Sequence, residues 1–206
     1  MSDKIDLKKD LKSLYAAKQG ACDLVDVPQL SYLMLDGEGD PALPAFGRAV
    51  GALYSVAYAI KTGRKKKGLG PDYAVMPLEG LWSVADGEFS WDAPKSSWHW
   101  TLLIAQPSFV SVADVSEAVC ALECKKEDAS LLPLVRLEDF GEGLCVQTLH
   151  LGPYAEERAA VEALMDGIGA RGFAPSGRHH EIYLNDPRRA EPAKLKTIVR
   201  RPVRRA

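Results

Sequence analysis

The 206-residue chain is long enough to form one domain, or two small ones, with a sizeable core. Its hydrophobic content of 47% and charged content of 26% are ordinary for a soluble globular protein, and its net charge of −2 provides no global field to attract nucleic acid or an acidic membrane. The N-terminus lacks an apolar signal core, and no apolar run reaches membrane-spanning length. We therefore expect a cytoplasmic protein with no nucleic-acid or membrane partner.

The first half of the chain is predicted to run strand, helix, strand, strand after an amphipathic N-terminal extension at residues 1–23. The helix is the clearest of these elements, because its apolar residues recur every three and four positions until Gly63 ends it. The expected elements are a strand region at Val25–Leu35, a helix at Leu43–Thr62, a loop at Arg64–Pro71, and strands at Asp72–Ala85 and Trp98–Ala105.

A second helix and the second half of the chain follow, and the order strand, helix, strand, strand appears again. The expected elements are helices at Ser111–Lys126 and Ala155–Arg171, strands at Val135–Leu137 and Gly143–Leu151, a strand around Glu181, and a last strand at Lys194–Val203. The repetition predicts an α+β fold: a pseudo-two-fold pair of strand-helix-strand-strand units forming an antiparallel sheet with helices on one face. The two repeats are expected at about residues 24–110 and 130–206, within one domain spanning 24–206.

The cysteines, the adjacent histidines and the basic clusters do not indicate a metal or nucleic-acid site. Cys120 and Cys124 lack the additional Cys or His pair that a zinc site needs. His179 and His180 are neighbours on a predicted strand, so they point to opposite faces and cannot chelate together. The basic clusters at 64–67 and 200–205 are interpreted as a solvated loop and a solvated tail. We expect neither a metal nor a cofactor.

Two of the predicted strands each carry an acidic and an aromatic residue. With a side-chain period of two, Glu181 and Tyr183 share one face of their strand while Ile182 lies on the other. The segment around Glu79 and Trp82 is a looser copy in the first unit. We expect Glu79 and Glu181 to hold equivalent places around one pocket, although Glu181 is also compatible with an ordinary acid on a half-exposed sheet.

Aromatic side chains predict the character of that pocket. Trp98 and Trp100 are two residues apart and share a strand face, where two large rings suit a flat or cationic ligand through stacking and cation–π attraction. The alternative is that these rings are simply core residues. Further candidate ligand-binding residues are Trp82, Tyr58 and Tyr154. For a hydrolytic reaction, the candidate catalytic residues are Glu181 as general base and Tyr183 as hydrogen-bond donor.

Four segments resemble the GyrI-like small-molecule-binding family, which is built from two SHS2-type strand-helix-strand-strand units. They are Tyr32–Pro41, Met76–Trp82, Leu149–Tyr154 and His179–Arg189, and the likeness extends over roughly residues 24–203. The resemblance implies a cleft between the units, with a glutamate inside it, that takes flat, hydrophobic and often cationic compounds. One branch of the family forms the ligand-sensing half of multidrug-responsive transcription regulators. A stand-alone branch, which this chain resembles in length and aromatic content, includes hydrolases that open the cyclopropane ring of DNA-alkylating cyclopropanoid antibiotics with an aromatic cage.

These observations lead to a functional hypothesis of xenobiotic protection: binding of hydrophobic or cationic polycyclic molecules, extended to hydrolysis of cyclopropanoid electrophiles. Two alternatives remain open, a non-catalytic sequestering or ligand-sensing module and a protein-interaction module of the gyrase-inhibitor type. Turnover of a strained-ring electrophile separates the enzyme from the binder. The sequence does not distinguish the oligomeric states.

Overall fold

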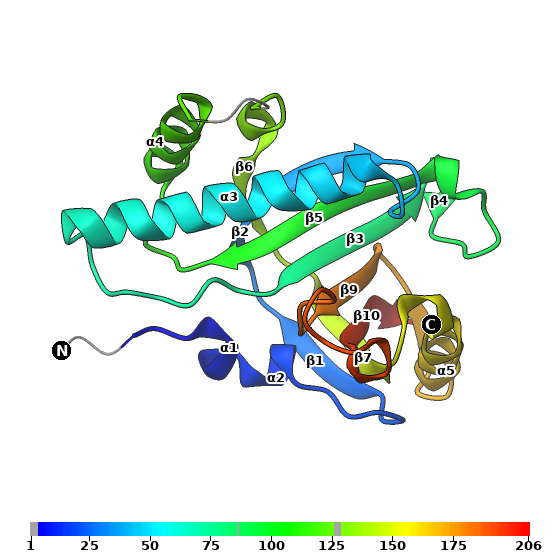
Figure 1. Ribbon diagram of the computed structural model, residues 1–206. Helices are drawn as coiled ribbons and strands as arrows, with labels where there is room; N and C mark the ends of the chain where they lie inside the picture. Colours follow the sequence, from blue (N-terminus) through cyan, green and yellow to red (C-terminus); the bar gives the residue numbers. More distant parts are fainter. Residues whose placement is uncertain (1–3, 86, 126–128) are drawn as a thin grey trace.

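An antiparallel sheet runs through the computed structural model, which describes residues 4–85, 87–125 and 129–206 (Figure 1). The longer strands are β2 (Leu30–Glu38), β3 (Leu78–Val84), β5 (Trp98–Gln106), β7 (Gly143–Leu151), β9 (His179–Tyr183) and β10 (Lys196–Arg205). Shorter strands are β1 (Asp23–Val27), β4 (Gly87–Glu88), β6 (Arg136–Phe140) and β8 (Phe173–Pro175).

The strand order shows the pseudo-two-fold arrangement. The order is β1-β7-β10-β9-β3-β5-β2-β6, with β4 paired to β3 and β8 paired to β10. From the central pair β9 and β3, the order outward is β10-β7 on one side and β5-β2 on the other. These are the corresponding strands of two units, β2-α3-β3-β5 and β7-α5-β9-β10. The predicted α+β fold class is confirmed.

The main helix of each unit lies on the same face of the sheet, which we call the first face (Figure 1). The helices are α1 (Leu7–Asp10), α2 (Lys12–Tyr15), α3 (Pro44–Lys67), α4 (Val112–Glu123) and α5 (Arg158–Gly169), with short 3-10 turns at Lys95–Ser97, Leu132–Leu134, Tyr154–Glu156 and Pro192–Lys194. Phe46 of α3 contacts Trp82 and Trp100, and Leu164 of α5 packs with Val199. The register places Trp82, Trp100 and Val199 on one face, because side chains alternate along each strand.

The opposite, second face of the sheet is partly covered by the N-terminal segment. The side chain of Gln147 donates to the carbonyl oxygens of Ser13 and Ala16, and Arg200 donates to that of Leu14. The short helices α1 and α2 therefore lie on the face away from α3 and α5. The expectation that helices occupy one face holds for α3 and α5 and not for this extension.

Helix α3 is longer than its pattern predicts. It continues through Gly63 to Lys67 and ends at Gly68, whose φ of 65° is the left-handed conformation that favours glycine. The predicted loop from residue 64 is wrong at its start, because ion pairs hold the added turn to its neighbours. Arg64 is 2.8 Å from Asp114, at the start of α4, and Lys67 pairs with Glu117.

Other boundaries also differ from the predictions. The first strand region is two strands, β1 and β2, separated by Pro28 and Gln29, since proline cannot donate to a sheet ladder. The supposed basic tail at 200–205 lies within β10, and Arg200 and Arg201 are buried. Helix α4 begins at Val112 with the predicted Ser111 as its N-cap, where Ser111 and Asp114 form a reciprocal capping box.

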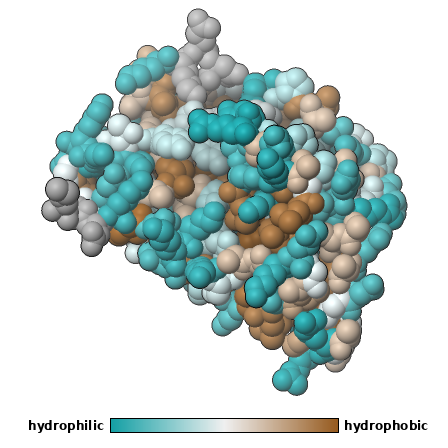
Figure 2. Space-filling model, turned by 60° about the horizontal axis from the view of Figure 1, so that its bottom comes forward, coloured by the Kyte–Doolittle hydropathy of each residue, from teal (hydrophilic) through white to brown (hydrophobic). Residues whose placement is uncertain are grey.

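One face of the molecule shows no single dominant surface character (Figure 2). Figure 2 presents one face with hydrophobic patches separated by hydrophilic side chains. In the described part of the chain, no helix is both long and apolar enough to cross a membrane.

Candidate functional site

An aromatic cluster occupies the first face at the centre of the sheet. Trp82, Trp98 and Trp100 are all buried there, and the ring centroids of Trp82 and Trp98 are 5.8 Å apart. Phe46 of α3 stacks on Trp82 at 5.8 Å and meets Trp100 edge-on at 5.2 Å. We define the aromatic cluster as Phe46, Trp82, Phe89, Trp91, Trp98 and Trp100. Its position joins three predicted ligand-binding residues from two neighbouring strands, β3 and β5.

Two glycines make room for the large rings. A Cβ atom on Gly37 of β2 would lie 2.0 Å from the ring of Trp100, which is paired with Gly37 across the strands. A Cβ atom on Gly80 of β3 would lie 2.9 Å from Nε1 of Trp82 and 3.2 Å from the hydroxyl of Tyr183. Each glycine is therefore required by a close approach of side chains.

We expect Gly37→Ala to lower the free energy of unfolding by about 1–3 kcal/mol, because the added methyl group overlaps the Trp100 ring. Urea unfolding followed by tryptophan fluorescence measures this loss. Gly47→Ala is the matched control: Gly47 lies in α3 with open space around it, so alanine should stabilise the helix by about 0.5–1 kcal/mol. Equal stability of the Gly37 variant and the wild type would contradict the close approach.

Glu181 lies at the edge of the aromatic cluster with two polar partners. The hydroxyl of Tyr183 donates to Glu181 Oε2 at 2.7 Å, and Nε2 of His179 is 3.0 Å from Oε1. Phe89 stacks on the His179 ring at 5.0 Å. Burial, and then the charge of Glu181, raise the pKa of Tyr183 well above its ordinary value. The side chain that donates to the carboxylate therefore keeps its proton.

A second buried acid, Glu157, lies near Glu181 and is absent from the sequence-based site. It is fully buried at the start of α5, and neither carboxyl oxygen has a hydrogen-bond partner among the described residues. Burial and the charge of Glu181 raise its pKa well above the ordinary value. Tyr154, one turn earlier, meets the Tyr183 ring edge-on at 5.6 Å. The site thus contains two carboxyl groups in different surroundings.

Two tyrosines of the predicted site occupy unequal places. The pKa of Tyr154 is raised to about 12 by burial, Glu181 and Glu157, which places it beside both acids. Tyr58 is mostly exposed on α3 and stacks on Tyr54, with ring centroids 6.3 Å apart. Tyr54 is the half-buried member of this pair, and the electrostatics of Tyr154 respond to it. Tyr58 therefore lies outside the aromatic cluster.

Glu79 does not share a pocket with Glu181, which corrects the sequence-based expectation. The register pairs Gly80 with Glu181 and Glu79 with Ile182, so Glu79 lies on the second face. There it is fully buried and accepts a hydrogen bond from the Tyr15 hydroxyl at 2.7 Å. A shift of one residue in register reverses the face of every side chain on a strand, and this separates the two acids.

The segment after β4 contributes two rings of the aromatic cluster, Phe89 and Trp91, which lie against Trp98. Phe89 and Trp91 lie 4.8 and 5.8 Å from Trp98, measured between ring centroids. Asp92 forms an ion pair with Arg158 of α5 at 2.9 Å. The ion pair is exposed, so it is a weak tether. Ring contacts hold Phe89 and Trp91 over Trp98, and this weak ion pair joins the same segment to α5.

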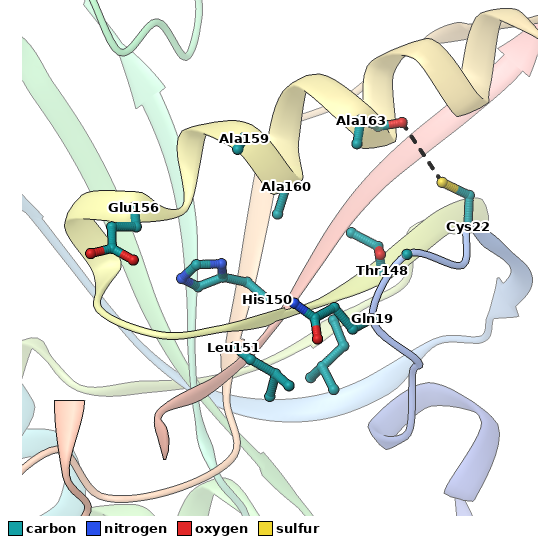
Figure 3. Close-up of a pocket in the computed structure, with 11 residues that line it drawn as sticks. Gln19, Cys22, Thr148, His150, Leu151, Glu156, Ala159, Ala160 and Ala163 are labelled. Carbon is teal, nitrogen blue, oxygen red and sulfur yellow. Dashed lines mark hydrogen bonds between the residues drawn. The ribbon is translucent and has the colours of Figure 1, made fainter. Parts of the chain in front are cut away.

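A separate groove of about 390 Å³ lies on the other side of α5. Figure 3 shows Glu156 and His150 at one end and Cys22 at the other, where the thiol donates to the carbonyl oxygen of Ala163. Neither Glu157 nor Glu181 lines it. In the described residues, no three His, Cys, Asp or Glu side chains are placed to hold a metal ion.

Comparison with known proteins identifies the family. Residues 104–204 match the model of the GyrI-like small molecule binding domain. An uncharacterized conserved protein from Listeria innocua superposes on the chain with a TM-score of 0.90 and 38% identity, covering 98% of this chain and 100% of its own. The chain belongs to the GyrI-like family. No curated protein sequence matches this GyrI-like chain.

Two further structures resemble this GyrI-like protein. A hydrolase encoded by lin2189 from Listeria innocua has a TM-score of 0.86 and 37% identity, covering 98% of this chain and 100% of that one. The EcmrR C-terminal domain has a TM-score of 0.59 and 13% identity, covering 90% of this chain and 98% of that domain. The second likeness shows the fold alone. The GyrI-like domain is thus a small-molecule-binding domain with an aromatic cluster at its centre.

Proposed function

We propose that this GyrI-like protein binds flat hydrophobic or cationic polycyclic molecules at the aromatic cluster and hydrolyses cyclopropanoid electrophiles there. The observation that carries the proposal is a buried carboxylate, Glu181, bonded to Tyr183 at the edge of several tryptophan rings. The proposed role is protection of the cytoplasm from reactive xenobiotics. The hydrolase from Listeria innocua, at 37% identity over nearly the whole chain, supports the enzymatic part.

The ligand class follows from the chemistry of the aromatic rings and the acidic side chain at the site. Large aromatic rings gain free energy by stacking on a flat ligand, and their faces attract cations. An acidic side chain in a water-poor surrounding strengthens the attraction to a cation, because little solvent screens it. Displacement of Phe89 and Trp91 from Trp98 would expose ring faces to such a ligand.

The proposed reaction opens a three-membered ring that is conjugated with a carbonyl group. Glu181 orients a water molecule and takes one of its protons as the water oxygen bonds to a ring carbon. The carbon–carbon bond of the ring breaks, and its electron pair moves through the conjugated system to the carbonyl oxygen. Tyr183, which donates to Glu181, holds the carboxylate in place for this step.

A non-catalytic sequestering module is the second candidate. Two acids and several aromatic rings are also what a tightly bound organic cation requires. In this alternative, Glu181 neutralises the ligand and no covalent step follows. The likeness to the EcmrR domain does not favour it, because that likeness concerns the fold alone.

The test combines binding and turnover. The protein is titrated with planar cations and neutral polycycles while tryptophan fluorescence is recorded, and loss of a cyclopropanoid electrophile is then followed by chromatography. Saturable quenching with turnover supports the enzyme, and saturable quenching without turnover supports the sequestering module. An absence of both would contradict a ligand site at the aromatic cluster.

We expect Trp98→Phe to weaken ligand binding about two- to tenfold, because one large stacking ring is replaced by a smaller one worth about 0.5–1.5 kcal/mol less. The smaller ring keeps the core filled better than alanine would. Tyr58→Phe is the matched control, since Tyr58 is exposed and outside the cluster. Unchanged affinity in the Trp98 variant for every bound ligand would place the binding surface elsewhere.

A further inference from the structure

Glu157 is a buried acid that the described residues leave without a hydrogen-bond partner. Its side chain is fully buried, and both carboxyl oxygens lack hydrogen bonds among the described residues. A buried carboxyl group without a hydrogen bond is costly, and a buried charge without a partner is costlier still. Such a group is retained where it holds a proton or meets a ligand.

The position of Glu157 makes this burial unusual. Glu157 precedes the first residue of α5, where an acidic side chain ordinarily accepts hydrogen bonds from free backbone N–H groups. Here the side chain makes no such capping bond. Its neighbours in sequence, Glu156 and Arg158, are both exposed. Glu157 alone of the three turns inward.

The start of α5, which carries Glu157, lies beside the residues around Glu181. The backbone N–H of Glu157 donates to the carbonyl oxygen of Tyr154 at 3.1 Å, and the Tyr154 ring contacts Tyr183. Tyr183 in turn donates to Glu181. The backbone of Glu157 is therefore linked through two tyrosines to Glu181, and the charge of Glu181 acts on the Glu157 carboxyl group.

The surroundings of the two carboxyl groups differ: those of Glu181 suit a general base, and those of Glu157 suit a general acid. Glu181 has a hydroxyl donor and an imidazole nitrogen at its oxygens, which suit a carboxylate. Within the described part of the chain Glu157 has no hydrogen-bond donor, and burial together with the charge of Glu181 raises its pKa. In enzymes, two titratable groups with such different surroundings commonly act as the acid and the base.

We propose that Glu157 is the general acid of this site and gives its proton to the carbonyl oxygen of the electrophile while Glu181 draws a proton from water. The inference rests on the proposed function. The oxygen–hydrogen bond of Glu157 breaks, and a new one forms on the oxygen that receives the electron pair from the opened ring. One water is consumed, and the product carries one new hydroxyl group on carbon and one on the former carbonyl oxygen. Proton exchange from Glu181 to Glu157, directly or through solvent, restores the starting state.

A general acid in the site restricts the substrate class further than an aromatic cage alone does. A proton donor in the same site as the base favours electrophiles whose strained ring is conjugated with an oxygen atom, because that oxygen accumulates negative charge. It also predicts that a permanent organic cation displaces the proton of Glu157 when it binds. A neutral polycycle should bind without proton release.

The test is Glu157→Gln, with Glu156→Gln as the matched control on the exposed neighbour. We expect Glu157→Gln to lower kcat for a cyclopropanoid electrophile at least about tenfold with a smaller change in KM, and to remove the fall in rate at high pH. Calorimetric titration with a permanent organic cation, in buffers of different ionisation enthalpy, should show proton release in the wild type and the Glu156 variant only.

Each outcome bears on a separate claim. Wild-type kcat and an unchanged pH profile in Glu157→Gln would overturn the acid role while leaving the proposed hydrolysis in place. Absence of turnover in the wild type would overturn the hydrolysis and the acid role together. If Glu157→Gln fails to fold, Glu157→Asp serves as the second variant: it keeps an ionisable group on a shorter chain, and its high-pH limb should persist with a reduced kcat. Loss of that limb in Glu157→Asp would also overturn the proposal.

Discussion

Glu181→Gln is expected to lower kcat for a cyclopropanoid electrophile at least about a hundredfold while leaving most ligand binding intact. The amide has nearly the shape of the carboxylate and still accepts a hydrogen bond from Tyr183, so the aromatic cluster should keep its packing. It cannot take a proton from water. The loss should therefore appear in kcat, as expected for a group that acts in the transition state.

The measurement is the rate of electrophile loss by chromatography, at saturating and at low substrate concentration. Glu79→Gln is the matched control, because Glu79 is an equally buried acid one register position away on the second face. It should retain kcat once folding is verified by circular dichroism. An equal loss of kcat in both variants would contradict the separation of the two acids by the sheet.

The sequence predicts correctly which side chains of one strand lie on the same face of the sheet. The period of two correctly places Glu181 with Tyr183, and Trp98 with Trp100, on shared faces. It does not predict the relation between strands, because the register of β3 against β9 depends on tertiary packing. The repeat in the sequence matches Glu79 to Glu181, but Gly80 pairs with Glu181 in the sheet, and Glu79 therefore lies on the opposite face.

The sequence also does not reveal which of two adjacent acids enters the site. Glu156 and Glu157 together are typical of the acidic first turn of a helix, where both are expected in solvent. The 3-10 turn at Tyr154–Glu156 rotates the chain before α5 begins, and this rotation directs Glu157 inward. The glycine opposite a tryptophan ring, Gly37, is similar: its role depends on a partner about sixty residues away.

The predicted solvated tail at 200–205 instead contributes Arg200 to a buried charge network on the second face. Arg200 is almost completely buried, and its guanidinium donates to Gln147 Oε1 at 3.0 and 3.1 Å and to the carbonyl oxygen of Leu14 at 2.6 Å. Its Nη1 lies 3.3 Å from Glu142, which also contacts Nδ1 of His180 at 2.8 Å. A run of arginines in sequence gives no sign that one of them is a core residue.

The charges of this network reinforce one another. Burial opposes the charge on His180, but Glu142 and Glu79 outweigh it and raise the His180 pKa to about 9. Burial also opposes the charge on Glu142, and the cations His180 and Arg200 outweigh it and lower the Glu142 pKa. The folded state therefore binds a proton at His180 that the unfolded chain releases above its ordinary pKa of 6.5. This contribution to stability is complete below that value and is lost as the pH rises through about 9.

Arg200→Met is expected to lower the free energy of unfolding by about 3–5 kcal/mol, because it leaves Glu142 with one cation fewer in a buried place and leaves the Leu14 carbonyl without its donor. Methionine keeps an unbranched apolar chain, so the loss reports on charge and hydrogen bonding more than on volume.

Urea unfolding measures this loss of stability, and hydrogen exchange should show faster opening of α1 and α2. Arg204→Met is the matched control, since Arg204 is exposed on the same strand. Because surface changes are usually worth less than about 0.5 kcal/mol, a change that small in Arg200→Met would contradict a structural role for the network. A large loss without faster exchange in the N-terminal segment would instead show that Glu142 and Gln147, rather than Leu14, are the partners that matter.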